Sequence, residues 1–255
     1  MPNTGIYAAA SAMLTDSRSV DVISNNIANA NTPGYRGATA LRGSFSQQLE
    51  MAEMRNGEID KDSGVFFDGT SRNFLNGDRV HTGETYDLAL EGEGFYLVNK
   101  DGKELLTRDS HFQLNNTGEL VTVDGWKVNG QGGTISIPAE AYGVEVDTQG
   151  RIHAVIPTDE GDTRTFIDQL RVATVEDKSK LRAYNGQYFH KDNHELLDTE
   201  EYMVYQGNIE ESNLNPVEEM VEMIAAQRRY EGAQKALKIQ IEIGAKYSSI
   251  LGGVS

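Results

Sequence analysis

Apolar residues recur at seven-residue intervals over the first thirty positions of the chain. The repeat consists of Ile6, Met13, Val20 and Ile27, and the interleaved positions hold Ala9, Ile23 and Ala30, with Asp16 as the polar exception. This spacing predicts an amphipathic helix from about Gly5 to Ala30, roughly 39 Å long at 1.5 Å per residue. The helix is expected to end at Asn31-Thr32-Pro33-Gly34, because proline is incompatible with a continuing helix and glycine permits the turn.

The last forty residues carry a second helical pattern. Asn215 is expected to be the N-cap, Pro216 the first helical residue and Glu218 the partner in a capping box. A seven-residue frame then holds mostly apolar side chains, interrupted by Gln227, Gln234 and Gly244; its apolar members are Met220, Met223, Tyr230, Leu237, Ile241 and Leu251. The pattern predicts a helix from about Pro216 to Leu251, roughly 54 Å long.

Both apolar stripes are narrow and contain many small side chains. Such a stripe suits contact with another helix better than contact with a wide sheet face. We therefore expect the two terminal helices to pair as a coiled coil that neighbouring copies of the chain complete. The alternative is that both helices pack on the middle of the chain and form one self-contained α+β globule.

The middle of the chain has the pattern of a β-sheet protein. Short runs alternate with period two or are rich in β-forming residues, at positions 86–90, 95–98, 120–123, 144–146 and 170–172. Turn pairs such as Asp101-Gly102, Asp124-Gly125 and Gln149-Gly150 separate them. The predicted fold class is α+β, with paired long terminal helices and a central all-β domain of short antiparallel strands. The expected division is 1–35 with 210–255 for the helical domain, 36–75 for an extended linker and 76–209 for the β-rich domain.

Composition argues against several kinds of partner and chemistry. The 23 basic and 39 acidic side chains give a net charge of −16, which repels nucleic-acid phosphates and anionic lipid. The chain has no cysteine and no run near the ~18 to 20 apolar residues of a membrane span. Its first residues do not have the pattern of a cleavable secretory signal, so export would need another route.

The sequence shows no constellation of residues that would support catalysis. Gly92-Glu93-Gly94 and the glycines at 130–133 lack the strand, helix and Lys-Ser/Thr pair of a nucleotide site. His190 and His194 are too few ligands for zinc, and the residues between them favour a loop. We therefore expect a protein that is not an enzyme, with no cofactor and no metal.

Three parts of the sequence together resemble one known family. Residues 21–35 read DVISNNIANANTPGY; residues 211–220 read ESNLNPVEEM and lead into IAAQRRYE at 224–231. Between them lie DLALEGEGF at 87–95, Thr107-Arg108, FQL at 112–114 and GELV at 118–121. These segments are similar to the signatures of flagellar axial proteins, the family of rod and hook subunits. They occur in the family's order and cover most of the chain.

The resemblance implies a structural subunit of a tubular assembly. In such proteins the two terminal helices form an inner layer and the β-domain lies outside, with head-to-tail contacts that do not close into a ring. The implied partners are other copies of the chain and neighbouring rod subunits. Asparagines inside the first helix are tolerated only when paired, and a paired amide fixes register. The residues expected at the subunit interface are Ile6, Met13, Val20, Ile23, Asn25, Asn26, Ile27, Asn29, Met220, Ile224, Tyr230, Leu237 and Ile241.

Members of the family are exported by the flagellar type III apparatus without cleavage. The resemblance therefore implies the export apparatus as a partner and the basal body as the location, in the cell envelope and periplasmic in a Gram-negative cell. Phe45 and Leu49 match the family's export-gate pattern, in which an apolar residue follows a phenylalanine by four positions. The alternative is an ordinary buried pair one helical turn apart.

The subtype within the family is inferred from the region that follows this motif. Residues 65–68 and 79–83 resemble the last proximal-rod subunit, and residues 50–83 are too short for the Gly- and Ser-rich insertion of the distal-rod subunit. We expect a proximal-rod subunit of the drive shaft that transmits torque from motor to hook, with the distal-rod subunit as runner-up. From another class, the alternative is a β-rich cell-wall or glycan-binding module. That module needs an exposed aromatic platform, whereas the single tryptophan, Trp126, is expected to cover the β-core.

Overall fold

The computed structural model describes residues 4–44, 65–158, 161–184, 186–191, 195–199 and 201–252. The chain divides into two compact units. The helical unit comprises the described residues of Met1–Ala28, Ala38–Asn73 and Asn215–Ser255. The β-rich unit comprises the described residues of Asn29–Gly37 and Phe74–Leu214. Both contain segments far apart in the sequence.

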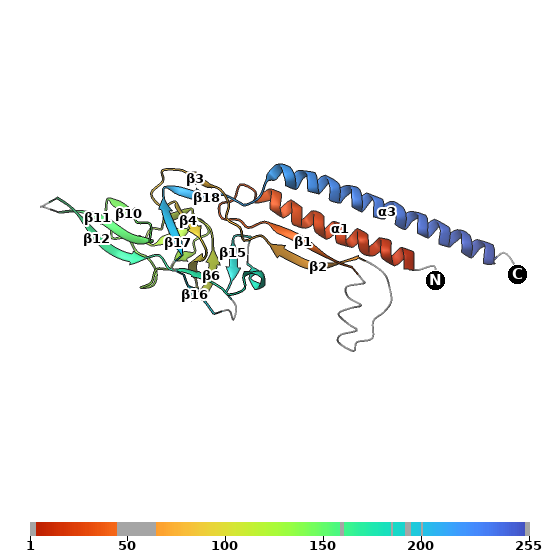
Figure 1. Ribbon diagram of the computed structural model, residues 1–255, viewed down its shortest axis with the longest axis horizontal. Coiled ribbons are helices and arrows are strands. Elements are labelled where there is room, and N and C mark those ends of the chain that lie inside the picture. Colours follow the sequence, from red (N-terminus) through yellow and green to blue (C-terminus); the bar gives the residue numbers. More distant parts are fainter. Residues whose placement is uncertain are drawn as a thin grey trace. The chain divides into compact units, whose positions relative to one another are not determined.

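The helical unit consists of two long helices and a two-stranded ribbon. Helix α1 spans Thr4–Ala28 and helix α3 spans Pro216–Gly252; the strands are β1 (Ala38–Ser44) and β2 (Val65–Arg72). The two helices lie side by side, and the antiparallel β1–β2 pair lies against α1 (Figure 1). The stretch expected as an extended linker thus contributes two paired strands to the helical unit.

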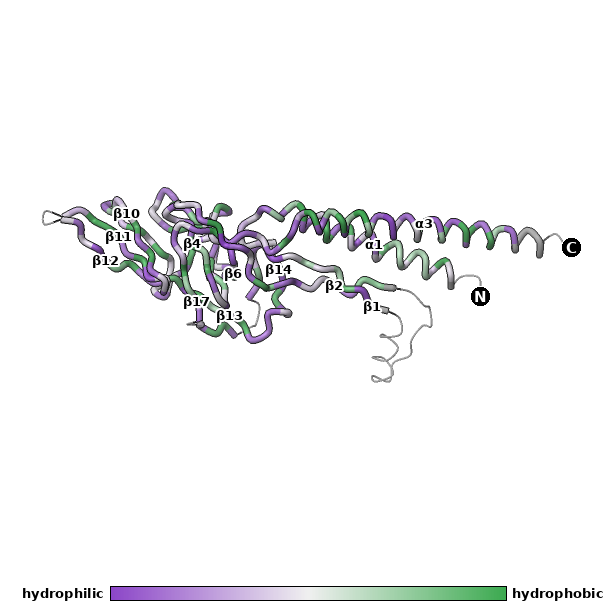
Figure 2. Tube along the Cα trace, turned by 45° about the horizontal axis from the view of Figure 1, so that its top comes forward, coloured by the Kyte–Doolittle hydropathy of each residue, from purple (hydrophilic) through white to green (hydrophobic). Residues whose placement is uncertain are grey.

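Local sequence signals determine where α3 begins. Asn215 Oδ1 accepts a hydrogen bond from the backbone N–H of Val217 at 3.0 Å, and the Asn215 carbonyl accepts one from the N–H of Glu219 at 3.0 Å. The first bond satisfies one of the N–H groups that a helix start leaves unpaired, and the second is the first regular i→i−4 bond of the helix. The predicted start at Pro216 is confirmed. Along α3, hydrophilic and hydrophobic residues alternate (Figure 2).

The β-rich unit contains three sheets. The largest has the order β14-β15-β6-β5-β9-β8-β7, with β13 joining β5 to β16; the others have the orders β10-β11-β12 and β17-β4-β18-β3. The strands are β3 (Arg79–His81), β4 (Leu88–Gly92), β5 (Phe95–Lys100), β6 (Lys103–Thr107), β7 (Phe112–Leu114), β8 (Leu120–Thr122), β9 (Lys127–Val128), β10 (Gly143–Val146), β11 (Arg151–Thr158), β12 (Gly161–Gln169), β13 (Val172–Thr174), β14 (Arg182–Ala183), β15 (Tyr188–His190), β16 (Leu197–Asp198), β17 (Tyr202–Gln206) and β18 (Asn208–Glu210). A short 3-10 helix spans Lys178–Lys180. Among the described strands, pairing is antiparallel except between β4 and β18.

The predicted strands and turns are found close to their expected positions. Asp101 and Gly102 join β5 to β6 with φ angles of 54° and 77°, the positive values that a two-residue type I′ hairpin turn requires. The run at 170–172 is the least accurate prediction, because β13 begins at Val172 and Leu170 instead bridges to Gly130. The α+β fold class is confirmed, and the coiled-coil geometry of the helix pair stays a prediction.

Both clusters of buried apolar side chains found among the described residues lie in the β-rich unit. The larger contains Tyr96, Leu105, Trp126 and Tyr188, and the smaller contains Phe95 and Phe189. Trp126 is only 6% exposed, so the prediction that it covers the β-core is confirmed. It therefore does not form the exposed platform that a glycan-binding module needs.

Candidate assembly surface

The side chains that α1 buries most completely are polar. They are Thr15, Asp16, Ser19 and Asn26, each 2 to 6% exposed. The apolar side chains expected at the subunit interface are only half-buried; they are Ile6, Met13, Val20, Ile23 and Ile27. Asp16, the exception to the heptad pattern, therefore lies deeper in this unit than the apolar residues around it.

Asp16 joins three elements of the helical unit. Its Oδ1 lies 3.2 Å from Arg42 Nη2 of β1 and 3.4 Å from Arg229 Nε of α3. Arg42 Nη2 also donates to Ser19 Oγ at 3.1 Å. Because the two arginines extend from different elements to one shielded carboxylate, this ion cluster fixes the register of α1 against both β1 and α3.

Asn26 makes a second polar connection. Its Nδ2 donates to the Ala38 carbonyl at 2.8 Å and to Glu219 Oε2 at 3.0 Å, and its Oδ1 accepts from the Ala38 N–H at 3.0 Å. The expectation that a buried asparagine amide is paired is confirmed here, and the partners belong to the same chain. Asn25 is exposed and donates to the Asp21 carbonyl at 2.9 Å. Asn29 is half-buried and belongs to the β-rich unit.

Helix α3 turns one stripe toward α1 and leaves other apolar residues exposed. Ala226 is fully buried, and Tyr230 and Leu237 on the same stripe are half-buried. Met220, Ile224 and Ile241, also expected at the subunit interface, are 51 to 53% exposed. The predicted interface residues of α3 therefore fall on two different faces.

The exposed apolar residues near the start of α3 form a continuous face. Val217, Met220, Val221 and Ile224 are 51 to 68% exposed. At 100° per residue they lie on the side of the helix opposite Ala226. We refer to these four residues as the α3 apolar face. On α1, Tyr7 and Leu14 are 55% and 63% exposed and lie seven residues apart, so they too share one side of their helix.

The described part of the chain contains no group of three or more His, Asp or Glu side chains placed to hold a metal ion. None of its helices is long and apolar enough to cross a membrane. Phe45 and Leu49, predicted as the export-gate motif, lie outside the described residues, as does His194.

The helical unit thus buries polar side chains within the chain and leaves apolar side chains exposed. Several exposed apolar residues that share one helix face are typical of a structural protein that packs against other chains. Three family models match: the flagella basal body rod protein at residues 6–36, the flagellar hook protein FlgE/F/G D1 domain at 89–154, and the flagellar basal body rod FlgEFG protein C-terminal region at 205–244.

Full-length relatives agree with these matches. The flagellar basal-body rod protein FlgF of Caulobacter vibrioides is 30% identical over 259 residues, covering 99% of this chain and 100% of that protein. FlgF of Rhizobium meliloti is 30% identical, with 92% of each chain covered. The rod protein FlgG of Bacillus subtilis is 29% identical, with 93% of this chain and 95% of that protein covered. The chain belongs to the flagellar basal-body rod protein family. It is accordingly a structural, non-enzymatic rod subunit of the flagellar basal body that assembles with other rod subunits.

Proposed function

We propose that the chain is a proximal-rod subunit that polymerises through its helical unit into the helical drive shaft between motor and hook. The observation that carries this proposal is the inverted burial of the helical unit. Asp16 and Asn26 use their hydrogen bonds inside the chain, while the α3 apolar face remains exposed. Neighbouring copies would bury that face, since removal of apolar surface from water is the main driving force of association.

The proposed contact is heterologous. Tyr7 and Leu14 of α1 and the α3 apolar face are different surfaces, so a copy that covers one leaves the other open for the next copy. Repetition of such a contact builds an open helical array rather than a closed ring. In this arrangement the helices form the coiled-coil inner layer. Met220, Ile224 and Ile241 contact neighbouring chains, and Tyr230 and Leu237 hold α1 and α3 together.

Oxidative footprinting of two methionines tests this contact. Met220 on α3 and Met203 on β17 are 51% and 53% exposed in the single chain, so a small oxidant should modify both at similar rates in the purified subunit. In isolated basal bodies we expect Met220 to be protected at least tenfold and Met203 to be protected much less. Equal oxidation of Met220 in the subunit and in the basal body would refute the proposed contact.

Two further parts of the proposal, the route of export and the subtype of rod subunit, rest on sequence resemblance. We propose export by the flagellar type III apparatus with Phe45 and Leu49 as the gate motif, and a periplasmic position in a Gram-negative cell. The relatives include FlgF, the proximal-rod type, and FlgG, the distal-rod type, at 29 to 30% identity. Sequence identity therefore does not separate the two subtypes, and the proximal-rod assignment rests on residues 50–83. Expression in strains lacking either the proximal or the distal subunit tests it; rescue of only the distal-rod strain would overturn the assignment.

A further inference from the structure

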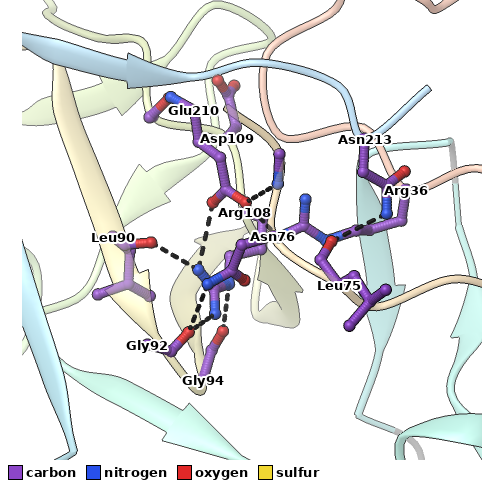
Figure 3. A network of polar contacts seen from close by, with 12 residues as sticks. Arg36, Leu75, Asn76, Leu90, Gly92, Gly94, Arg108, Asp109, Glu210 and Asn213 are labelled. Carbon is purple, nitrogen blue, oxygen red and sulfur yellow. Dashed lines mark hydrogen bonds and ion pairs between the residues drawn. The ribbon is translucent and has the colours of Figure 1, made fainter. Parts of the chain in front are cut away.

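The segments by which the chain enters and leaves the β-rich unit meet at one side chain. The unit receives the chain after α1 as Asn29–Gly37, receives it again from Phe74, and releases it at Leu214 toward α3. Each of these three connecting segments, after α1, from Phe74 and before α3, contributes a residue to a small polar cluster around Glu210 (Figure 3). We name this cluster the Glu210 junction; its members are Arg36, Gly77, Arg108, Glu210 and Asn213.

Glu210 uses all its polar groups in the junction. Its Oε1 accepts from Arg36 Nη2 at 2.6 Å and from the Gly77 N–H at 2.9 Å, and its Oε2 accepts from Arg108 Nη1 at 3.2 Å. Its backbone carbonyl accepts from the Gly34 N–H at 2.8 Å. Its own N–H donates to Ser110 Oγ at 2.8 Å. The side chains of Arg36, Arg108 and Glu210 are at most 4% exposed.

Arg108 connects this carboxylate to the sheet. Its guanidinium donates to the carbonyls of Leu90 at 2.7 Å and Gly92 in β4, and of Gly94 at 2.5 Å in the turn before β5 (Figure 3). The planar guanidinium, with five donors in fixed directions, holds these carbonyls and Glu210 together in a way that a lysine ammonium does not.

Asn213, three residues after Glu210, connects the same segments a second time. Its Oδ1 accepts from the Gly37 N–H at 2.9 Å, and its Nδ2 donates to the Leu75 carbonyl at 2.9 Å. Between the two side chains, the Glu211 N–H donates to the Asp78 carbonyl at 2.8 Å. The last residues before α3 are therefore bonded to the segment that follows α1 and to the segment that precedes β3.

We propose that Glu210 is a positioning residue for rod function. It joins the three connecting segments into one rigid block of the β-rich unit. The segment that follows the end of α1 and the segment that precedes the start of α3 are then held at a fixed separation. A load on the β-rich unit therefore reaches both helices together rather than through one connecting segment. The load-bearing role rests on the proposed function, whereas the rigidity of the block does not.

Distance measurement between spin labels on the purified full-length chain tests the rigidity. The chain has no cysteine, so labels at Asn31→Cys and Glu211→Cys, both exposed positions of the β-rich unit, have no background. We expect one narrow distance distribution in the parent. Glu210→Gln, which removes the charge shared by two buried arginines, should broaden it at least twofold. Arg36→Lys should broaden the distribution less than Glu210→Gln does. It replaces Glu210→Gln as the test variant if Glu210→Gln does not fold.

The matched control is Glu91→Gln, which removes the exposed Arg79–Glu91 ion pair of the same unit, at 2.7 Å. It should leave the distribution unchanged. An unchanged width in a folded Glu210→Gln or Arg36→Lys variant, or equal broadening by Glu91→Gln, would overturn the inference. In cells, Glu210→Gln should allow basal bodies to form but reduce swimming in viscous medium more than Glu91→Gln does. If the parent chain itself forms no basal bodies, the proposed function fails while the distance result stands.

Discussion

Asn26 of α1 bonds both backbone groups of Ala38 in β1. The amide nitrogen donates to the Ala38 carbonyl at 2.8 Å, and the amide oxygen accepts from the Ala38 N–H at 3.0 Å. Ala38 is 8% exposed and Asn26 is 2% exposed, so water cannot easily replace either bond. One side chain thereby supplies Ala38 with the pair of hydrogen bonds that a neighbouring β-strand would otherwise supply.

Replacement of Asn26 by Ala should destabilise the helical unit by about 2 to 6 kcal/mol, because two buried backbone groups lose their partners at about 1 to 3 kcal/mol each. Urea unfolding followed by helical circular dichroism measures the change. Asn25→Ala is the matched control, since Asn25 is exposed and adjacent, and its effect should stay within about 0.5 kcal/mol. Equal effects of the two substitutions would show that the Asn26–Ala38 pairing contributes nothing.

The β-rich unit should become less stable as pH rises through the range from about 4 to 6. Burial raises the pKa of the Asp109 carboxyl from 3.8 to about 6, although the His111 N–H bonded to it opposes the shift. Since the folded-state pKa lies above the unfolded value, the folded chain binds this proton more tightly. The stability contributed by this proton is present below about pH 4 and lost as pH rises to about 6.

Asp109→Asn should remove this dependence, because the amide keeps an acceptor for His111 and carries no charge. We expect the variant to be more stable at pH 7.5 by up to about 3 kcal/mol, from two pKa units at about 1.4 kcal/mol each, and to gain nothing at pH 4. Thermal unfolding at both pH values measures it. Glu140→Gln, at an exposed carboxyl of the same unit that does not contribute to the Asp109 shift, is the control. A constant difference between Asp109→Asn and the parent across the pH range would contradict the argument.

Two glycines should respond oppositely to alanine. Gly34 has φ of 67°, and an added Cβ would lie 2.2 Å from the Arg108 carbonyl oxygen and 2.6 Å from the Asp109 nitrogen. Both neighbours are backbone, so Gly34→Ala should cost about 3 kcal/mol or more. Gly232 lies inside α3 with nothing within 4 Å of an added Cβ, so Gly232→Ala should stabilise by about 0.5 to 1 kcal/mol. Differential scanning calorimetry measures the stability change of both variants. A Gly34→Ala variant as stable as the parent would exclude the close approach of Gly34 to the Arg108 backbone.

The features predictable from sequence are those that depend on neighbouring residues. The α3 start at Pro216 and the Asp101-Gly102 turn follow from capping and turn chemistry within a few positions, and both were found. The heptad pattern located the helices but not the faces that they bury. Asp16 interrupts the pattern because its partners, Arg42 and Arg229, belong to other elements, and a helical period contains no information about them.

The Glu210 junction was not predictable from spacing at all. Arg36 and Glu210 are separated by 174 positions, and Arg108 and Glu210 by 102. Arg36 and Glu210 each stand next to a segment that resembles the rod family, and Arg108 lies within one. Charged residues are usually exposed. Only the fold shows that three of them are buried together. The sequence offered one clue: Arg36 and Glu210 adjoin the N- and C-terminal segments that resemble the family, and Arg108 belongs to the central segment.

The α3 apolar face provides the test of assembly that is least confounded by folding. Ile224 is 52% exposed, so Ile224→Asp removes little internal packing and should change the stability of the purified subunit by less than about 0.5 kcal/mol. In a growing rod the same carboxylate would have to be buried against apolar side chains of a neighbouring copy, which is strongly unfavourable without a partner. We therefore expect loss of incorporation into basal bodies and loss of motility.

Ala236→Asp is the matched control for Ile224→Asp, because it adds the same charge to an exposed position of the same helix that is turned about 120° away from Ile224. Its basal bodies should form at near-parental numbers when counted by electron microscopy. If Ile224→Asp assembles as well as Ala236→Asp does, α3 contacts its neighbours through another face. If both fail, added negative charge rather than lost apolar contact blocks assembly, and the α3 apolar face loses its assigned role.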